Sequence, residues 1–338
     1  MEENSLLLLT DSLLKNSFDV IIIGAGPGGL SCAQVLQKSE LSVLILEKSG
    51  KVIKKNCGGG VTSLAANLFV PDDISRVFSE VVVKIGNKDS RVKFEQPLRT
   101  VSRVDLSEFQ LSQIKKDKVQ IKFEENVKEI WEDKVVTDKG EYCYKYLVGA
   151  DGANSIVVKH LNLKPKLSIA INAHIDLKMD EPIWFVDQKL FGAGYLWFFP
   201  HLEFTSVGIY TPDRVNIEEL KELLVQKVRE RGFSSTFEIK AGSVNSSFKG
   251  CLFENIFLVG DAAGLTLKTT GEGIPGAVIS GQEVAKRIVD PEYKMSELKR
   301  YVKLKKRREF AGAFLSKVPC LQNILFRLFL KYKKVRNS

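Results

Sequence analysis

The strongest chemical signal in this 338-residue sequence is a glycine-rich segment, GAGPGG, at residues 24–29. An apolar run at 19–23 precedes it and reads as a buried parallel strand, and the stretch at 30–38 reads as a helix. A second apolar run, at 42–46, ends at Glu47. Glycines placed between a strand and a helix, with an acidic residue about 20 positions further on, are typical of a βαβ unit that binds a dinucleotide.

The residue types in this unit suit that chemistry. Gly24 allows a tight turn, Gly26 lets the backbone approach a pyrophosphate, and Gly29 lets the helix pack close to the strand. The start of the helix offers unpaired N–H groups and a positive dipole end to phosphates, and Glu47 can accept a hydrogen bond from a ribose hydroxyl. A structural glycine turn without a ligand is the alternative. The expected dinucleotide contacts are Gly24, Gly26, Pro27, Gly28, Gly29, Glu47 and Lys48.

A second glycine-rich segment, GDAAGLTLKTTGEGI at 260–274, indicates which dinucleotide binds. It follows an apolar strand-like run at 256–259, so Asp261 stands at the end of a strand, where a carboxylate can bind a sugar or ribitol hydroxyl. An apolar helix is expected from about 275 to 288, and amides at its start suit the N1/C2=O edge of a flavin, which becomes anionic on reduction. NAD has no such edge, so FAD is favoured. The expected contacts here are Asp261, Gly271, Gly273 and Ile274.

A third motif, VGADGANS at 148–155, adds a family resemblance. It is similar to the GADG-x-x-S segment of FAD enzymes with the p-hydroxybenzoate hydroxylase fold, which implies a cofactor contact at Asp151. Within that group the chain resembles the geranylgeranyl reductases, because GDAAG is followed by TTGEGI and by the pair Ser280 and Gly281. The resemblance spans roughly residues 18–290.

Two shorter segments also resemble these reductases. CGGG at 57–60 is similar to their Cys-Gly-Gly segment, and YLWFFP at 195–200 to their Y-x-W-x-F-P motif. One departure is Gly192, where the family often has proline. Ring hydroxylases of the same fold usually have histidine at the position of Gly264, and flavin halogenases carry a related W-x-W-x-I-P motif. The segments favour the reductases over both.

The resemblance implies an α/β fold with α+β elements: a Rossmann-type FAD-binding domain, an inserted antiparallel-sheet substrate domain and a C-terminal helical tail. Residues 169–177 alternate in polarity, as a sheet with two unlike faces requires. Asn216 begins a capping box for a helix that Gly232 ends. The expected parts are a leader at 1–17, a discontinuous FAD-binding domain at 18–163 and 250–290, a substrate domain at 164–249, and a basic helical segment at 291–338.

The resemblance also implies roles for single side chains. Val127 would lie beside the adenine. Arg103 would lie near the flavin's phosphates or isoalloxazine, or else be an exposed arginine that begins an amphipathic helix. Cys57 and its neighbour Gly58 would contact the cofactor near the isoalloxazine. Cys57 would donate a proton or position an alkene. The alternative is that Cys57 is a small buried thiol without a catalytic role. His201 reads as a structural histidine.

Tyr195, Trp197 and Phe199 alternate along one expected strand, so their side chains should share one face. On spacing alone an ordinary aromatic core face is the better explanation, whereas the resemblance favours a wall that binds a long apolar substrate. Tyr195 is also a candidate proton donor, although an unperturbed tyrosine pKa of ~10 makes it a slow one. The predicted catalytic residues are Cys57, Tyr195 and Trp197.

Composition bounds the class of protein. A hydrophobic content of 44% allows a large core, divided into two or three lobes. Five cysteines without a C-x-x-C pair argue against a disulfide framework and a zinc site, and no His/Asp/Glu spacing suggests another metal. The N-terminus lacks the positive charge of a signal peptide, and no stretch approaches the ~20 apolar residues that span a bilayer. We expect a cytoplasmic protein.

The net charge of +9 is concentrated in the tail, which has 13 basic residues and one acid from Lys299 onward. Residues 299–308 form a basic cluster, and apolar residues recur at helical spacing in 321–330. This pattern is typical of a peripheral contact with the anionic inner face of a membrane. The alternatives are a helix pair packed on the body with a solvated basic face, and a docking site for an acidic electron-transfer protein.

The sequence therefore predicts an FAD-dependent reductase that saturates isolated double bonds of geranylgeranyl or related polyprenyl chains by hydride transfer from flavin N5. A flavin monooxygenase or halogenase is the alternative with the same fold, and a non-redox FAD protein acting on prenyl lipids is one of another class. The electron donor would be NAD(P)H or ferredoxin, because the chain has one dinucleotide fingerprint. The expected partner is a prenyl lipid, and no nucleic acid is expected.

Overall fold

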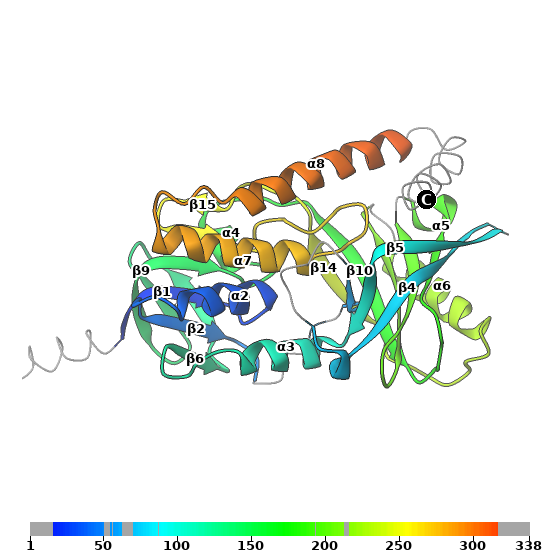
Figure 1. Cartoon of the computed structure of the whole chain (residues 1–338), viewed down its shortest axis with the longest axis horizontal. Coiled ribbons are helices and arrows are strands. Elements are labelled where there is room, and N and C mark those ends of the chain that lie inside the picture. The colour runs from blue at the N-terminus through cyan, green and yellow to red at the C-terminus, as the bar shows by residue number, and fades with distance from the viewer. Residues whose placement is uncertain are drawn as a thin grey trace, which may run out of the picture.

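The computed structural model describes residues 16–50, 55, 57–62, 70–86, 88–192, 194–212 and 216–316. These residues form two eight-stranded sheets, and Figure 1 shows helices α2, α7 and α8 gathered on the first. The fold is α/β, as the sequence predicts. Most of the expected leader, and the apolar repeat at 321–330, lie outside the described residues.

The first sheet has the strand order β15-β16-β9-β1-β2-β6, with β8 beside β9 and β7 beside β8. Its strands are β1 (Ser17–Ile23), β2 (Val43–Glu47), β6 (Val119–Phe123), β7 (Val127–Ile130), β8 (Lys134–Thr137), β9 (Glu141–Gly149), β15 (Leu252–Phe253) and β16 (Ile256–Leu258). β1 pairs in parallel with β2 on one side and β9 on the other. Its continuous apolar sequence follows from this central position, because a strand buried on both faces has no polar side.

Glycines let the helices of this half pack closely. α2 (Pro27–Leu36) follows β1, and α7 (Ile274–Val289) follows β16 almost at the other end of the chain. A Cβ on Gly281 would overlap the carbonyl oxygen of Gly28, and a Cβ on Gly29 would overlap that of Gly24. The glycines therefore bring α7 onto α2, and α2 onto the turn after β1.

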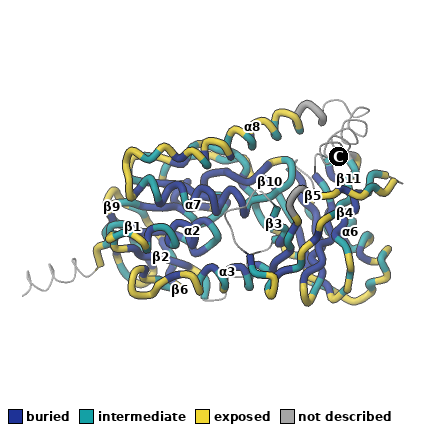
Figure 2. The backbone as a smooth tube through the Cα atoms, viewed as in Figure 1, coloured by how far each residue is buried: buried dark blue, intermediate teal, exposed yellow. Residues whose placement is uncertain are grey.

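α8 (Ser296–Ser316) runs along the outside of α7 (Figure 1). Its own residues Leu298 and Tyr301 are buried. Figure 2 shows α2 and α7 mostly buried, whereas burial and exposure alternate along α8. The first part of the predicted basic tail is therefore a helix packed on the body. The shorter helices are η2 (Asp72–Ile74), α3 (Arg103–Ser112), α4 (Ile156–His160) and α5 (Gln188–Phe191).

The second sheet has the strand order β14-β10-β13-β12-β11-β4-β5-β3. Its strands are β3 (Gly60–Val61), β4 (Ser75–Ile85), β5 (Lys88–Val101), β10 (Leu167–Ile175), β11 (Ile183–Val186), β12 (Tyr195–Pro200), β13 (Thr205–Thr211) and β14 (Lys240–Asn245). Three of these strands, β3 to β5, come from the range 18–163, which the sequence analysis assigned to the FAD-binding domain. They join the second sheet because β4 pairs in parallel with β11, a contact between residues about 100 positions apart.

The two faces of the second sheet have different partners. Leu196 and Phe198 of β12 belong to a core with α6 (Ile217–Arg229), which supplies Leu220 and Leu224. The residues that alternate with them along β12 point to the other face. There they belong to a separate aromatic cluster: Tyr195, Trp197 and Phe199. The predicted alternation along this strand is confirmed, and the aromatic cluster lies on the face opposite α6.

Candidate active site

A cavity of about 1770 Å³ lies between the two sheets. The ends of β1, β2 and β9 line it on one side, and the aromatic face of the second sheet lines it on the other. Cavities that bind drug-sized molecules measure about 300–1,000 Å³, so this one has room for a large cofactor together with a second ligand.

The cavity gathers the residues that the sequence analysis selected. Gly29 is the exception, because it lies behind the turn and packs against Gly24. The following predicted residues line the cavity: Gly24, Gly26, Pro27, Gly28, Glu47, Lys48, Cys57, Gly58, Arg103, Val127, Asp151, Tyr195, Trp197, Phe199, Asp261, Gly271, Gly273 and Ile274. Their individual roles stay predictions. No cluster of three metal-ligating side chains occurs in the described part of the chain.

The turn after β1 is open toward the cavity. Gly24 has a φ of +102°, and a Cβ there would lie 2.6 Å from the carbonyl oxygen of Ala150. At Gly26 the nearest atom to such a Cβ is the same oxygen at 4.0 Å, so this glycine faces open space in the cavity. Gly26 is also the N-cap of α2, and no side chain caps the helix. The first amides of α2 therefore remain available to an anion.

Glu47 holds the same turn from the end of β2. Its carboxylate accepts hydrogen bonds from the backbone N–H of Ala25 and of Ser49, each at 2.8 Å. The side chain is 6% exposed and lines the cavity. Each carboxylate oxygen has a second lone pair, so Glu47 can still accept a hydrogen bond from a ligand hydroxyl.

Three residues that line the cavity bury a polar atom without a hydrogen-bond partner among the described residues. One is Trp184 Nε1 of the second sheet, and the other two are Arg103 Nε and Asp151 Oδ1. Arg103 is 6% exposed, so the alternative of an exposed arginine at this helix start is wrong, and the cofactor contact remains the prediction. Burial lowers the pKa of Arg103 and raises the pKa of Asp151. An unpaired polar group is costly to bury, and both atoms fit a polar ligand such as FAD that would satisfy them.

At the far end of the cavity, Asp261 and the start of α7 stand together. Asp261 accepts a hydrogen bond from Thr266 Oγ1 at 2.6 Å and forms an ion pair with Lys55 at 3.2 Å. Gly273, the N-cap of α7, provides no side-chain cap. As at α2, the free amides suit a partner that carries negative charge, such as the reduced flavin.

The sequence analysis missed Glu272, which also lines this end of the cavity. Its Oε1 accepts hydrogen bonds from Thr62, from Oγ1 at 2.5 Å and from the backbone N–H at 3.3 Å. Burial raises the pKa of Glu272, while the bond from Thr62 and the charge of Arg308 oppose that rise. The sequence could have indicated this residue, because Glu272 is the one charged residue of the TTGEGI motif.

The opposite wall is aromatic. Trp184 of β11 contacts Tyr195 edge to face with centroids 6.0 Å apart, and Phe94 of β5 lies at the same distance from Trp184. Trp197 continues the wall and donates from Nε1 to Ser206 Oγ at 3.2 Å. Trp184 and Phe94 also line the cavity and were missed, because neither belongs to a recognisable motif and they lie on separate strands.

Tyr195 already has a partner for its hydroxyl proton. The hydroxyl donates to the carbonyl oxygen of Thr270 at 2.8 Å, and burial raises the Tyr195 pKa. Proton transfer from this side chain would therefore have to break that hydrogen bond. The contact joins the aromatic wall to the loop that precedes α7.

The Cys57–Gly58 turn lies between the two walls. Asn172 Nδ2 donates to the carbonyl oxygen of Cys57 at 3.3 Å, and a Cβ on Gly58 would lie 3.0 Å from Trp197 Nε1. His201 Nε2 lies 3.1 Å from the carbonyl oxygen of Gly58 and donates to it in the tautomer that carries the proton there. His201 is therefore structural, as predicted, and it fixes the segment that presents Cys57 to the cavity.

Comparison with known proteins agrees with this geometry. The sequence profile of the pyridine nucleotide-disulphide oxidoreductase family matches residues 18–174. An uncharacterized protein from Methanosarcina barkeri is 30% identical, over 80% of this chain and 74% of that protein. Digeranylgeranylglycerophospholipid reductase 3 from Methanosphaera stadtmanae is 26% identical, over 84% of this chain and 81% of that protein.

Two solved structures share the fold. A geranylgeranyl bacteriochlorophyll reductase-like protein from Thermoplasma acidophilum has a TM-score of 0.72 and 22% identity, covering 87% of this chain and 84% of that chain. The p-nitrophenol 4-monooxygenase PnpA from Pseudomonas putida has a TM-score of 0.75 and 17% identity, covering 94% and 95%.

The fold and the site together define the class: an FAD-dependent oxidoreductase with a Rossmann-type cofactor domain. Within that class, the chain belongs to the geranylgeranyl reductase family. The predicted fold, cofactor and family are confirmed.

Proposed function

We propose that the protein saturates isolated double bonds of a geranylgeranyl or related polyprenyl chain, which it binds between FAD and the aromatic wall. The observation that carries this proposal is the continuity of one large cavity from the turn after β1 to the aromatic face of the second sheet. The names of the reductase relatives support the choice of substrate.

FAD, when bound and reduced by the electron donor, would supply a hydride to one carbon of the substrate double bond. The turn at Gly26 would receive the pyrophosphate, and Glu47 would accept a hydrogen bond from a ribose hydroxyl. Asp261 and the first amides of α7 would hold the flavin end. These amides favour negative charge, and so they favour the reduced form of the cofactor.

The aromatic wall would bind the hydrocarbon chain. Trp184, Tyr195, Trp197 and Phe199 belong to two adjacent strands, and Leu98 of β5 extends the same face. Each methylene that leaves water for such a surface contributes about 0.8 kcal/mol to binding. A long prenyl chain can therefore bind tightly without specific polar contacts.

The second carbon of the double bond needs a proton. Cys57 is the better candidate in the structure, because it lines the cavity beside the aromatic wall and Tyr195 already donates its proton to Thr270. We propose that Cys57 donates the proton or positions the alkene, and that Tyr195 and Trp197 hold the chain against the reacting carbon. An isolated double bond is unactivated, so the two transfers must be closely coupled.

A monooxygenase or halogenase is the alternative of the same fold. Gly264 argues against it, because this position, where ring hydroxylases usually have histidine, has a φ of +72°. A Cβ there would lie 2.7 Å from the backbone nitrogen of Phe248. A histidine would therefore strain the backbone and push this turn away from its neighbour.

The test is a single turnover without oxygen. The full-length holoprotein is reduced anaerobically and mixed with geranylgeranyl diphosphate, and flavin absorbance is followed while products are identified by mass spectrometry. We expect rapid reoxidation of the flavin and a product two hydrogen masses heavier per reduced bond. The fully saturated phytanyl diphosphate is the matched control and should leave the flavin reduced. Turnover that requires oxygen, or turnover without a flavin redox change, would refute the proposal.

We also propose that the exposed side of α8 meets an anionic membrane, where a poorly soluble prenyl lipid resides. No helix in the described part of the chain is both long and apolar enough to cross a bilayer. Phe310 is 78% exposed, and the neighbouring Arg308 lines the cavity. Each basic residue near an anionic leaflet contributes about 1 kcal/mol, which salt screens. The exposed basic residues of α8 are Lys299, Arg300, Lys303, Lys306 and Arg307.

Liposome flotation tests this contact. The protein should float with anionic vesicles at low salt and less at high salt, and a Lys303→Glu/Lys306→Glu/Arg307→Glu variant should stay in solution. Lys115→Glu/Lys116→Glu/Lys118→Glu makes the same charge change on exposed residues beside β6 and should still float. Equal flotation of the two variants would refute the contact. NAD(P)H and ferredoxin both remain candidate electron donors.

A further inference from the structure

Residues 264–273, here called the flavin loop, connect Asp261 to the start of α7. Four side chains donate hydrogen bonds to carbonyl oxygens along it. Two come from the second sheet, with Tyr195 donating to Thr270 at 2.8 Å and Tyr210 to Lys268 at 2.9 Å. Two come from α8, with Tyr301 donating to Leu265 at 3.1 Å and Lys305 to Thr266 at 2.8 Å.

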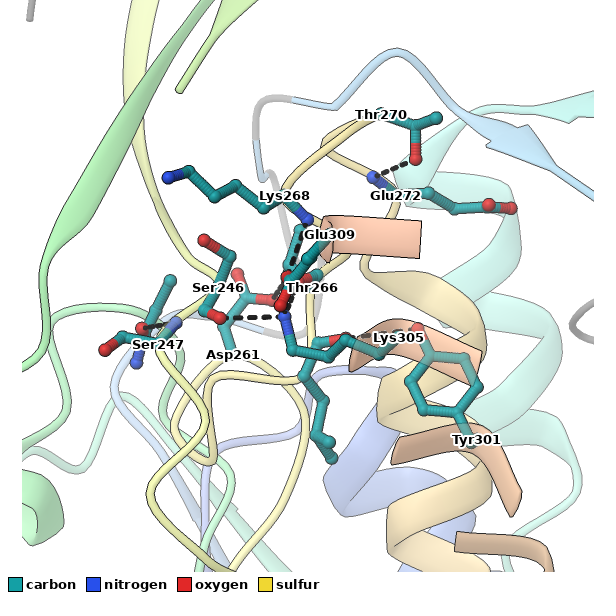
Figure 3. Close-up of polar contacts among 12 residues, drawn as sticks. Ser246, Ser247, Asp261, Thr266, Lys268, Thr270, Glu272, Tyr301, Lys305 and Glu309 are labelled. Atoms are coloured by element: carbon teal, nitrogen blue, oxygen red, sulfur yellow. Dashed lines mark hydrogen bonds and ion pairs between the residues drawn. The ribbon is translucent and has the colours of Figure 1, made fainter. Parts of the chain in front are cut away.

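Lys305 is the unusual member of this set. It was counted in the basic cluster that the sequence predicts to face a membrane, yet it is 1% exposed. Its ammonium group donates to the carbonyl oxygens of Ser246 at 2.7 Å and Thr266 at 2.8 Å, and it pairs with Glu309 one turn further along α8. Figure 3 shows Lys305 reaching from α8 toward these partners. The three donors of the ammonium are all used.

Glu309 extends the contact to a second point of the loop, because its carboxylate accepts a hydrogen bond from the backbone N–H of Lys268 at 3.2 Å. The Lys305–Glu309 pair therefore binds one carbonyl and one amide of the same loop. A buried ammonium costs several kcal/mol in lost hydration, and an apolar side chain of similar volume is often no less stable in such a place. Stability alone does not account for a lysine here.

The contacts lead directly to the cofactor end of the cavity. Thr266, whose carbonyl Lys305 holds, donates its hydroxyl to Asp261 Oδ1 at 2.6 Å. A Cβ on Gly273 would lie 2.8 Å from Thr266 Oγ1 and 3.0 Å from Asp261 Oδ1, so this pair abuts the N-cap of α7. A shift of Thr266 would therefore move both the Asp261 carboxylate and the amides that begin α7.

We propose that Lys305 and Glu309 of the C-terminal helix are positioning residues for the flavin half of FAD. They fix the flavin loop so that Asp261 and the start of α7 meet the cofactor in one geometry. The proposal depends on FAD binding and not on the identity of the substrate. It assigns the buried side of α8 to the cofactor site, and the exposed side remains free for other contacts.

The test uses Lys305→Met, which keeps the length of the side chain and removes its donors. Lys305→Met/Glu309→Gln also removes the carboxylate charge that the single variant would leave unpaired. Lys303→Met, on the exposed side of the same helix, is the matched control. FAD dissociation from the full-length holoprotein, the midpoint potential of the bound flavin, and ADP binding to the deflavinated full-length protein are measured for each.

We expect FAD to bind at least tenfold more weakly in both Lys305 variants. ADP affinity should stay unchanged, because Lys305 bonds to Ser246, Thr266 and Glu309, and not to the turn at Gly26 and Glu47. A tenfold larger loss for reduced than for oxidised FAD would lower the two-electron midpoint potential by about 30 mV. Lys305→Arg keeps the charge and part of the hydrogen bonding, so it should show a smaller change in the same direction.

Two results would overturn the proposal. The first is a Lys305→Met variant whose FAD affinity is within about twofold of the wild-type value and whose midpoint potential is within a few millivolts of it. That result would mean that the loop does not need Lys305. An equal loss of FAD and ADP binding would mean that Lys305 only supports the fold. Failure of prenyl reduction in the wild-type protein would leave these measurements unaffected, so the two proposals fail separately.

Discussion

Replacement of His201 by glutamine should remove a large part of the protein's loss of stability in mild acid. His201 is 5% exposed, and its Nδ1 is buried without a hydrogen-bond partner among the described residues. Burial lowers the pKa of His201 from 6.5 to about 4, with His174 and Arg76 acting in the same direction and Gly58 and Asp105 opposing it. A proton on Nδ1 would have no acceptor, which is the physical reason for the low pKa.

The size and direction of the effect follow from this pKa. The unfolded chain binds a proton at His201 as the pH falls through 6.5, whereas the folded chain resists it until about pH 4. Stability is therefore highest above pH 6.5 and falls between these two values. The difference of about 2.5 pKa units corresponds to about 3 kcal/mol in the free energy of unfolding.

Urea denaturation of the holoprotein at several pH values between 7 and ~4 measures the effect. Glutamine places an amide N–H close to the position of Nε2, so His201→Gln can keep the hydrogen bond to Gly58 and cannot ionise. Its free energy of unfolding should fall less steeply than that of the wild-type protein. Some slope will remain because burial also lowers the pKa of His174, which stacks on the same phenylalanine, Phe204.

His160→Gln is the matched control, since His160 is exposed at the end of α4. This variant should keep the full pH dependence of the wild-type protein. If His201→Gln and wild-type curves remain parallel, His201 does not resist protonation in the folded state, and the reasoning about its buried Nδ1 is wrong.

Three further predictions concern the cavity. Gly26→Val should give a folded, colourless protein, because the valine side chain would occupy open space on the path of the pyrophosphate. Gly242 also faces open space, and Gly242→Ala, as the control, should keep the yellow absorbance of bound FAD. Cys57→Ala should lower the rate of flavin reoxidation by a prenyl substrate about 10²-fold or more if the thiol donates the proton, and an unchanged rate and product pattern would remove that role. Trp197→Ala or Tyr195→Ala should retain FAD but weaken the binding of long prenyl chains more than that of short ones, which KM measurements would show. Loss of the flavin instead would mean that these aromatic residues are part of the structural core and do not bind substrate.

The cofactor unit could be predicted from the sequence because its signals are local. A strand, a turn that requires φ above zero at Gly24, and a helix that starts without a cap follow one another within a short stretch. The same holds for the strand, the acid and the glycines from 256 to 274. Each residue type there is set by its immediate backbone, so the fold class and FAD followed from the chain alone. The alternation of Tyr195, Trp197 and Phe199 is local in the same sense.

Only the tertiary structure decided which distant segments complete the site. β4 joins the second sheet through pairing with β11, and this brings Phe94 and Trp184 into the aromatic wall. Neither the pairing nor the place of Phe94 and Trp184 in the wall has a sequence signal, because a strand's own pattern does not identify its partner.

Arg103 and Lys305 show the same limit for charged residues. Lys305 read as part of a basic surface cluster, and for Arg103 a cofactor contact and an exposed helix start were both open, since charged side chains are rarely buried without partners. The fold buries Arg103 against the cavity, and it buries Lys305 because carbonyl groups from Ser246 and Thr266 meet at its ammonium group. Those acceptors lie about 40 and 60 residues away along the chain, so the sequence determined the charge of these side chains, and the long-range packing of the chain determined what that charge contacts.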